Sequence, residues 1–486
     1  MSARYAGTTY ESNDDTFIRL IGIIISIGAV ISFAIVLFYF FTMDMYIAGP
    51  ILYFVIVDAA LIAAGLYLFL SGRANRNNIL RFVSFAMVGL MLFINLFLWS
   101  YLDATKEIIA PTVTSSGAIE YSIVAQRTAG IQLSEKTEIR AGIQSTDAFK
   151  KEVERETSKL TAATFKEFNS ISEIINATEI EKVEIAVVQS AMLNAFAEYF
   201  PESFDNLDIL ATFKAGTEKS QSAANDIKVD ITKPFSIYVS GLDTDGDIHQ
   251  TARSDSNMLI LIDPEHYKML LINTPRDYYV QLPGTRGYPD KLCHAGIYGI
   301  DMCEQTISEL YGIDIDYHVQ INFTTVSTFV ESMGGIIVNN PRTFELWGQT
   351  YKEGEIWLNG DQALLFARAR KGLEEGDLDR GKNQQLVIEG IVHRITSPDV
   401  VTHYKKLIRN LSGTFLSNVP SSVITQLFSR QIALGGSWTI EKMNAAGTPA
   451  QRPTYSMGSE DLSVIIPDYN SINEISMAIN DFMRGK

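Results

Sequence analysis

"PFSIYVSGLD" (residues 234–243), "NMLILIDPE" (257–265) and "KMLLINTPRD" (268–277) are short apolar runs that end in polar or turn-forming residues. Such runs are typical of strands buried on both faces of a mainly parallel or mixed sheet. Segments with helical spacing follow them, among them "CEQTISELYGI" (303–313) and "TVSTFVESMGGI" (325–336). This alternation predicts an α/β domain with a central mixed sheet flanked by helices.

The length of the chain, 486 residues, is enough for about three units. We place the α/β domain at residues 231–486 and expect its end, from residue 397, to be mostly helical before a last strand and helix. The sequence pattern of residues 104–230 predicts a small α+β accessory domain. It contains no recognisable group of catalytic residues. Within it we expect a helix over residues 146–168, and the polar stretch 214–234 reads as a linker.

The first 103 residues contain three long apolar runs, at about 17–41, 47–70 and 80–101. A helix needs about 20 apolar residues to cross a lipid bilayer, so we predict an anchor of three transmembrane helices. The loop "SGRANRNNILR" (71–81) carries three arginines and no acid. Because basic loops stay in the cytoplasm, we expect a multi-pass protein of the cell membrane, with its N-terminus cytoplasmic and its C-terminal domains extracytoplasmic.

Net charge and the two cysteines limit the classes of function and site that the chain can have. The formal net charge is −16, and no run of Lys and Arg forms the basic face that nucleic-acid binding needs. Cys293 and Cys303 lie in the part predicted to face an oxidising compartment, where they could form a disulfide. Two buried free thiols are the alternative. His294 alone lies near them, so zinc-ligand spacing is missing.

Arginines and aspartates gather where the predicted strands and helices end. They are Asp243, Arg253, Asp255 and Arg276, then Arg368, Arg370, Asp377, Arg380 and Gln384 within "ARARKGLEEGDLDRGKNQQ" (367–385). In open α/β sheets the loops at strand ends form the ligand crevice. Guanidinium groups bind phosphate oxygens in pairs, and Mg²⁺ prefers carboxylate and phosphate oxygens. The pattern therefore favours a polyanion site, while structural Arg–Asp ion pairs remain the alternative.

Several motifs occur in a fixed order: "RSDS" (253–256), "TPRD" (274–277), "KLCHAGIYG" (291–299), "YGIDIDYHVQINF" (311–323) and "GDLDRGKNQQ" (376–385). With them the chain resembles the LytR-CpsA-Psr family of cell-wall glycopolymer ligases. The resemblance is close over residues 234–398. The predicted three-helix anchor and accessory domain resemble those of its capsule-type members.

This resemblance implies a phosphotransferase of Gram-positive cell wall biogenesis. It would move a glycopolymer, a capsular polysaccharide or a teichoic acid, from a polyprenyl-pyrophosphate carrier to peptidoglycan. The implied pyrophosphate ligands are Arg253, Arg276, Arg368, Arg370, Arg380 and Gln384. Asp243 and Asp255 would hold Mg²⁺, or Mn²⁺ in its place, and Asp377 would orient an arginine or support the metal. The implied catalytic set is Asp243, Arg253, Asp255, Arg276 and Asp377.

One departure from the family pattern concerns the residue before the paired glutamines. Many members have an arginine there, whereas this chain has Lys382 and Asn383, so Lys382 could supply that head-group contact. Two other functions remain open: a non-catalytic regulator that senses lipid-linked polysaccharide during export, and a polyprenyl-pyrophosphate phosphatase. Capsule-assembly membrane proteins are expected partners. DNA-binding control of transcription is contradicted by the predicted topology and the charge.

Overall fold

The computed structural model describes residues 13–42, 49–74, 78–109, 115–116, 119–134, 138–147, 149–216, 219–220, 230–370, 373, 376–397, 410 and 413–485. Contacts within the chain define two compact units. The first contains Met1–Ile109 and Ser421–Gly435, and the second contains Ala110–Pro420 and Gly436–Lys486. The domain boundaries expected near residues 103 and 230 stay predictions.

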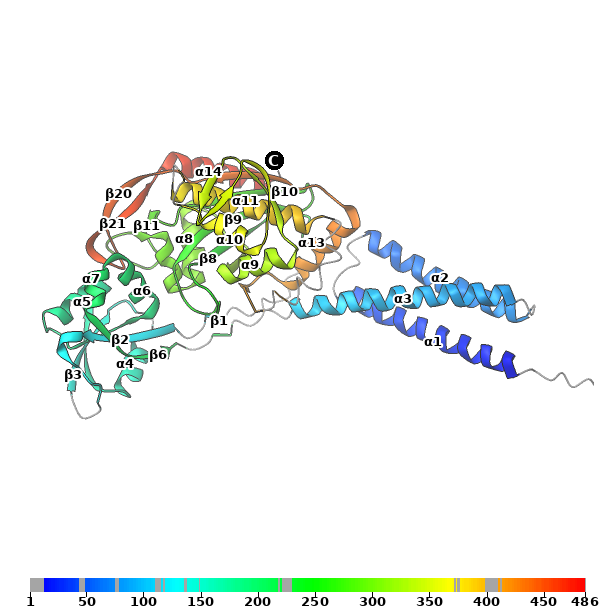
Figure 1. Cartoon of the computed structure of the whole chain (residues 1–486), viewed down its shortest axis with the longest axis horizontal. Coiled ribbons are helices and arrows are strands. Elements are labelled where there is room, and N and C mark those ends of the chain that lie inside the picture. Colours follow the sequence, from blue (N-terminus) through cyan, green and yellow to red (C-terminus); the bar gives the residue numbers. More distant parts are fainter. Residues whose placement is uncertain are drawn as a thin grey trace, which may run out of the picture. The chain divides into compact units, whose positions relative to one another are not determined.

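The first unit consists of long helices (Figure 1). They are α1 (Asn13–Thr42), α2 (Gly49–Ala74), α3 (Asn78–Ile109) and α13 (Ser421–Leu434). The three apolar runs are thus helical, although residues 47 and 48 of the second run lie outside the described residues. Among the residues that the structure describes, no helix is both long and apolar enough to cross a membrane. The bilayer-spanning topology therefore stays a prediction.

The second unit is built on a six-stranded sheet with the order β18-β13-β8-β9-β10-β19. Its strands are β8 (Phe235–Leu242), β9 (Ser254–Asp263), β10 (Lys268–Thr274), β13 (Tyr317–Ile321), β18 (Leu416–Ser417) and β19 (Thr439–Asn444). The three quoted apolar runs form the antiparallel centre β8-β9-β10, and β13 and β19 add in parallel to its two sides. The mixed α/β sheet is confirmed.

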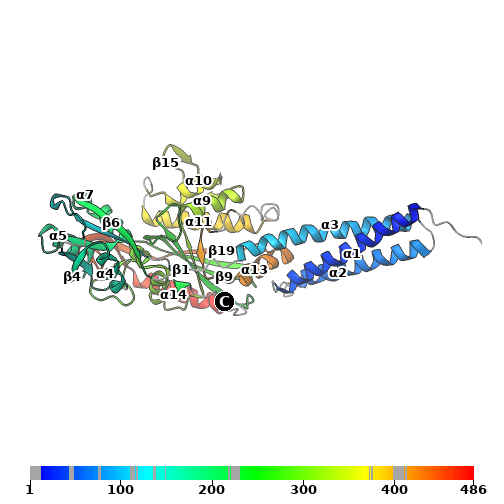
Figure 2. The ribbon, with the colours of Figure 1, turned by 90° about the horizontal axis from the view of Figure 1, so that it is seen from below.

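Helices cover both faces of this sheet (Figure 2). On one face lie η3 (Leu292–Tyr298), α8 (Ile300–Tyr311) and α14 (Tyr469–Met483), which bury Tyr238, Leu259 and Ile272 of the sheet in one apolar cluster. On the other face lie α9 (Phe323–Ser332), α10 (Gly360–Arg368) and α11 (Asp377–Ile395). The strand pairs β14 (Ile336–Asn340) with β17 (Gly354–Leu358) and β15 (Phe344–Leu346) with β16 (Gln349–Tyr351) complete this layer.

A second sheet lies upstream, with the order β4-β3-β5-β2-β6. Its strands are β2 (Ile119–Gln126), β3 (Glu138–Gln144), β4 (Ala162–Phe168), β5 (Ile185–Gln189) and β6 (Leu207–Ala215). Its helices are η2 (Arg127–Ala129), α4 (Lys150–Ser158), α5 (Ile171–Glu179), α6 (Ser190–Tyr199) and α7 (Pro201–Asp205). We call these elements the accessory sheet. Residues 217–218 and 221–229 of the expected linker lie outside the described residues, and β1 (Ser115–Ser116) pairs with β7 (Lys219–Ser220) beside them.

Two expectations about helices are wrong. The helix expected over residues 146–168 ends at Ser158, because the β-branched and aromatic residues after it form β4, which pairs in parallel with β3. The tail from residue 397 is not mostly helical either, since β19, β20 (Gly447–Thr454) and β21 (Gly458–Pro467) occupy much of it. Pro449 and Pro453 disfavour a helix there. The last strand and helix, β21 and α14, are confirmed.

The disulfide between Cys293 and Cys303 is also wrong, because both cysteines are free and buried. Cys293 lies in η3 beside the site, where its backbone N–H donates to the carbonyl of Arg276 at 2.8 Å. Cys303 lies in α8 and packs against the sheet. Burial raises the pKa of each thiol to about 12, so both stay protonated and poorly reactive. The short strands β11 (Tyr279–Val280) and β12 (Asp290–Lys291) lead into this region.

Candidate active site

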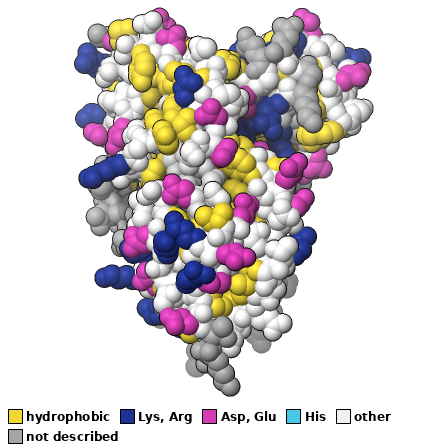
Figure 3. Space-filling model, turned by 90° about the vertical axis from the view of Figure 1, so that its left-hand side faces the viewer, with side chains coloured by type: hydrophobic (Ala, Val, Ile, Leu, Met, Phe, Trp, Pro, Cys, Tyr) yellow, Lys and Arg dark blue, Asp and Glu magenta, His cyan; other side chains and the backbone are white. Residues whose placement is uncertain are grey.

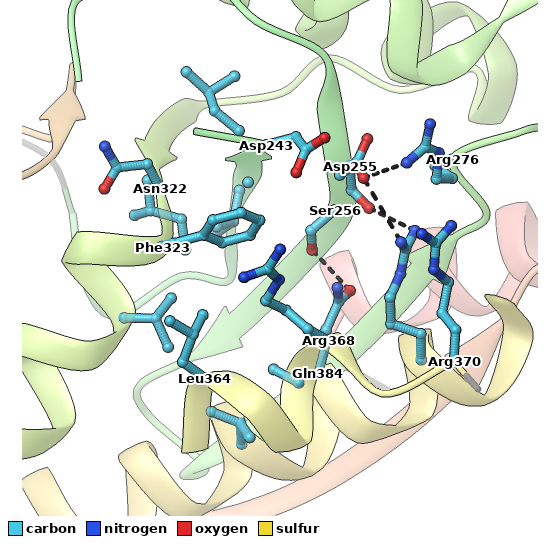
Figure 4. A pocket seen from close by; sticks show the side chains of 18 of the residues that line it. Asp243, Asp255, Ser256, Arg276, Asn322, Phe323, Leu364, Arg368, Arg370 and Gln384 are labelled. Carbon is cyan, nitrogen blue, oxygen red and sulfur yellow. Dashed lines mark hydrogen bonds and ion pairs between the residues drawn. The ribbon is translucent and has the colours of Figure 1, made fainter. Parts of the chain in front are cut away.

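A pocket of about 440 Å³ lies between the sheet and the layer of α9, α10 and α11 (Figure 4). It is lined by all of the predicted site residues except Asp377: Asp243, Arg253, Asp255, Arg276, Arg368, Arg370, Arg380 and Gln384. They come together because β8 and β9 are antiparallel, so the end of β8 lies beside the start of β9. Asp377 lies next to this group, with its Oδ1 2.7 Å from Nη2 of Arg380.

The β8–β9 loop holds the first charged pair. The backbone N–H of Asp243 donates to the carbonyl of Arg253 at 3.1 Å, which closes the loop. Nη2 of Arg253 then donates to Oδ2 of Asp243 at 2.6 Å. The side chain of Arg253 is 11% exposed, and that of Asp243 is 27% exposed. The carboxylate of Asp243 therefore orients the guanidinium of Arg253 across the closed loop.

Asp255 lies between two buried arginines. Its Oδ2 accepts a short hydrogen bond from Nη1 of Arg276, and Nη1 of Arg380 lies 3.6 Å from the same oxygen. Nη2 of Arg380 also donates to the backbone carbonyl of Asp255 at 3.0 Å. The side chains of Arg276 and Arg380 are only 4% and 7% exposed. Two guanidinium groups, which stay charged at any physiological pH, thus contact the same carboxylate, that of Asp255.

Helix α11 brings Arg380 and Gln384 to the sheet. It begins after Gly376, whose φ of 54° is one that glycine adopts readily. Nε2 of Gln385 donates to the carbonyls of Leu271 and Met443, at 3.1 and 2.8 Å, and so fixes the helix on β10 and β19. Gln384, one residue earlier, accepts a hydrogen bond from the hydroxyl of Ser256 at 2.9 Å.

Arg368 and Arg370 form the exposed side of the arginine group. The guanidinium of Arg368 stacks over the ring of Phe323, 3.9 Å from its centroid, and this contact orients it without neutralising its charge. Both arginines are exposed to solvent. On the face of the molecule in Figure 3, acidic and basic side chains are interspersed, and a group of basic side chains lies recessed in a hollow.

The electrostatics of the site suit a charged ligand. Burial raises the pKa of Asp255, while Arg276 and Arg380 oppose that shift. Oδ1 of Asp255 is a buried atom without a hydrogen bond among the described residues. Nη1 of Arg253 and Nε of Arg276 also make no hydrogen bond of good geometry, although carboxylates of Glu198 and Asp277 lie 2.5 and 3.5 Å from them. Buried polar atoms in native proteins nearly always have partners, so Oδ1 of Asp255 above all indicates a ligand that completes the site.

The other half of the pocket is apolar. Its lining comes from the sheet, from α9, α10 and α11, and from the β15–β16 hairpin: Val239, Leu242, Ile321, Phe323, Val326, Leu346, Leu364, Val387, Ile388 and Ile391. The pocket can thus take a ligand with an anionic group and an attached apolar chain. Phe323 was missed as a site residue, although it ends the motif "YGIDIDYHVQINF". Lys382 does not line the pocket; its Nζ lies 3.4 Å from Asp379.

A hard cation fits the two predicted carboxylates. Among the described residues no three His, Cys, Asp or Glu side chains form a group that could hold a metal ion. Asp243 and Asp255 line the same pocket, and Oδ1 of Asp255 is free to bind. Mg²⁺ commonly uses one or two carboxylates and takes its remaining ligands from phosphate and water. The residues present therefore fit Mg²⁺ bound together with a phosphate ligand.

Gly296→Ala should destabilise the protein by about 1–3 kcal/mol, the usual range for overpacking. A Cβ at Gly296 would lie 2.5 Å from the carbonyl oxygen of Ala252 and 2.5 Å from the backbone nitrogen of Ser254. Backbone atoms beside Arg253 cannot move aside as a flexible side chain would. Denaturant unfolding measures the change, and Gly89→Ala, which meets nothing within 4 Å, is the control. Equal stability of the two variants would contradict the close packing of η3 on β9.

Asp277→Asn should lower the free energy of unfolding at neutral pH by about 3 kcal/mol, because it leaves the buried Lys291 unpaired. Oδ1 of Asp277 lies 3.1 Å from Nζ of Lys291, whose side chain is 4% exposed. Burial alone would raise the pKa of Asp277, but Lys291 and Arg276 outweigh it and lower the pKa.

A carboxyl with a lowered folded-state pKa stabilises the protein above its unfolded-state pKa, and this stability is lost as the pH falls through the folded-state pKa. The difference between wild type and Asp277→Asn should therefore shrink in acid. Unfolding curves from neutral pH down to about pH 3 measure it, with the exposed Asp461→Asn as the control. A difference that stays constant with pH would contradict the ion pair.

The model of the LytR_cpsA_psr family matches residues 206–475, more than half of the 486-residue chain. The chain belongs to the LytR_cpsA_psr family. Every predicted LytR_cpsA_psr site residue falls inside the matched range, whereas α1, α2, α3 and most of the accessory sheet fall outside it.

Curated relatives carry transferase names. A polyisoprenyl-teichoic acid–peptidoglycan teichoic acid transferase, TagU, of Enterococcus faecalis is 34% identical over 202 residues, which cover 41% of this chain and 66% of that protein. TagU of Bacillus licheniformis is 29% identical over 212 residues, covering 43% of this chain and 68% of that protein. The crystal structure of Bacillus subtilis TagV aligns with a TM-score of 0.45 at 26% identity, over 52% of this chain and 98% of that one. This LytR_cpsA_psr chain thus spans just under two thirds of the E. faecalis relative.

Proposed function

We propose that this protein is a phosphotransferase that moves a glycopolymer, teichoic acid or capsular polysaccharide, from a polyprenyl-pyrophosphate carrier to peptidoglycan. The observation that carries the proposal is the arginine group of the pocket beside an apolar slot. An isolated anion would need only the charged half, and a lipid would need only the apolar half. The transferase names of the TagU relatives agree with a carrier of this kind.

Phosphoryl transfer asks the protein mainly for positioning and for stabilisation of charge. Arg276 and Arg380, buried and fixed by Asp255, would hold the pyrophosphate oxygens in one orientation. Arg368 and Arg370 would meet it from the exposed side, and Gln384 would add an amide contact. The polyprenyl chain would lie in the apolar half of the pocket, which excludes water from the reacting phosphorus.

We further propose that the reaction depends on Mg²⁺, with Mn²⁺ as a substitute, held by Asp243 and Asp255. When bound, the cation would neutralise charge that builds up on the phosphate oxygens. Asp377 would keep Arg380 in place, since it pairs with Nη2 of that arginine at 2.7 Å.

The membrane anchor and the extracytoplasmic location belong to the same proposal. Large apolar side chains on α1, α2 and α3 are exposed, among them Ile24, Ile31, Ile56, Phe82 and Phe93. A water-soluble helix buries most such residues, so this surface suits contact with lipid or with capsule-assembly membrane proteins. A donor carried by a polyprenyl chain also resides in a bilayer, so an anchored enzyme meets it there.

The full-length protein in detergent, given a radiolabelled polyprenyl-pyrophosphate oligosaccharide, Mg²⁺ and peptidoglycan fragments, separates the candidate functions. Label joined covalently to peptidoglycan supports the transferase. Label released as free oligosaccharide phosphate makes the protein a phosphatase. Tight donor binding without any product, with an acceptor that a known transferase can use, makes it a sensor.

A further inference from the structure

One carboxylate in the pocket comes from the accessory sheet. Glu198, near the end of α6, lines the pocket together with Asp243 and Asp255. Its Oε2 lies 2.5 Å from Nη1 of Arg253. Glu198 precedes the range 206–475 that the family model matches. The accessory sheet therefore extends the site instead of only lying beside it.

Helix α6 is held firmly at this place. Met192, Leu193 and Phe196 of α6 are buried in an apolar cluster that joins the accessory sheet to η3 and β21. Tyr199, the residue after Glu198, contacts the domain built on the six-stranded sheet. Its hydroxyl lies 3.3 Å from Nε2 of His294, and Nζ of Lys291 lies 4.7 Å from the centroid of its ring. The position of Glu198 at the pocket is thus fixed from both sides.

His294, which Tyr199 contacts, belongs to a buried polar cluster of the domain built on the six-stranded sheet. Nδ1 of His294 lies 2.7 Å from Oδ1 of Asp290 and 2.8 Å from the hydroxyl of Ser456, in the turn between β20 and β21. The backbone N–H of Ser456 donates to Oδ2 of Asp290 at 3.0 Å. Because these groups satisfy one another, His294 serves as a rigid support for Tyr199 and not as a reacting group.

Glu198 differs from the other two pocket carboxylates in exposure. Its side chain is 50% exposed, against 27% for Asp243 and 13% for Asp255. Arg253 is thus flanked by two carboxylates, Asp243 on Nη2 and Glu198 on Nη1. Its Nη1 still lacks a hydrogen bond of good geometry, so a pyrophosphate oxygen can take that position from Glu198.

We propose that Glu198 is the acceptor-side carboxylate of the transfer reaction, an inference that rests on the proposed function. The lipid-linked donor occupies the apolar and arginine-lined interior, so the acceptor sugar arrives from the solvent side, where Glu198 lies. Once the pyrophosphate has taken Nη1 of Arg253, the freed carboxylate of Glu198 accepts a hydrogen bond from the acceptor hydroxyl.

The acceptor oxygen forms a bond to the sugar-linked phosphorus, and the bond from this phosphorus to the bridging oxygen of the polyprenyl phosphate breaks. Glu198 takes the proton of the acceptor hydroxyl and passes it to solvent, while polyprenyl phosphate leaves with the electron pair. General-base help of this kind contributes about 100-fold or more to a rate.

The test uses full-length Glu198→Gln, Glu198→Asp and, as a matched control, Glu202→Gln, which changes an exposed glutamate of the neighbouring helix α7. Donor affinity is measured with a polyprenyl-pyrophosphate oligosaccharide, and kcat and KM for a peptidoglycan fragment are measured separately. We expect Glu198→Gln to bind the donor within about twofold of wild type and to lose about 100-fold in kcat. Glu198→Asp should recover part of the rate, and Glu202→Gln should match wild type.

Each other outcome overturns the inference. Unchanged kcat in Glu198→Gln removes any role in the reaction. A loss of donor affinity that accounts for the whole loss of rate shows that Glu198 only positions Arg253. A wild-type protein that binds donor and transfers nothing refutes the proposed function itself, and that result is visible before any variant is compared.

Discussion

Arg276→Lys should lower the rate of transfer by about 100-fold or more, the usual loss when one fixed donor to a developing charge is removed. The side chain of Arg276 is 4% exposed, binds Asp255 through Nη1 and lines the pocket. A lysine keeps the positive charge but offers a single compact donor group in place of the planar fork. Charge alone therefore cannot restore the geometry.

The rate of transfer and the donor affinity are measured for this variant, with Arg452→Lys as the control, because Arg452 is an exposed arginine on β20. Thermal unfolding confirms that the variant is folded. If Arg276→Lys transfers polymer at the wild-type rate, the assignment of the arginine group to the pyrophosphate is wrong.

Asp255→Asn should lower transfer by about 1000-fold and remove its dependence on Mg²⁺. The substitution keeps the shape of the side chain and removes the negative charge that pairs with Arg276 and Arg380. It also weakens Oδ1, the buried oxygen that is free to bind a cation. Two separate contributions to the site are lost at once, so the effect exceeds that of a single hydrogen bond.

Transfer is measured over a range of Mg²⁺ concentrations, and Asp245→Asn is the control because Asp245 is exposed in the same loop and does not line the pocket. Chelator should stop the wild-type reaction. A wild-type protein that is fully active in chelator would remove the metal from the mechanism, whatever the variant does.

The centre of the fold could be predicted from the sequence because its strands are continuous apolar runs. β8, β9 and β10 form at the three apolar runs. Charged residues at the ends of these strands line one pocket. Arg368, Arg370 and Arg380 join them because α10 and α11 pack over the same face of the sheet. Residues at the ends of recognisable elements therefore line one pocket, while their roles stay predictions.

The differences between the predicted and the observed structure have physical causes. β4 was expected to continue the helix over residues 146–168, but parallel pairing with β3 decides its conformation. The two cysteines suggested a bridge by their spacing, but their side chains pack in different surroundings. Glu198 gave no local signal at all, since a single glutamate on an amphipathic helix looks like any solvated charge until the fold brings it to Arg253.

The most direct test of the account follows the phosphorus. A donor labelled with ³²P in the sugar-linked phosphate is incubated with the full-length protein, Mg²⁺ and peptidoglycan fragments, and the products are separated into lipid and peptidoglycan fractions. Attack on that phosphorus, as the arginine-lined pocket predicts, places the label in peptidoglycan and leaves unlabelled polyprenyl phosphate. Label that remains on the lipid as polyprenyl pyrophosphate would mean attack at the sugar carbon, and it would contradict phosphoryl transfer at this site.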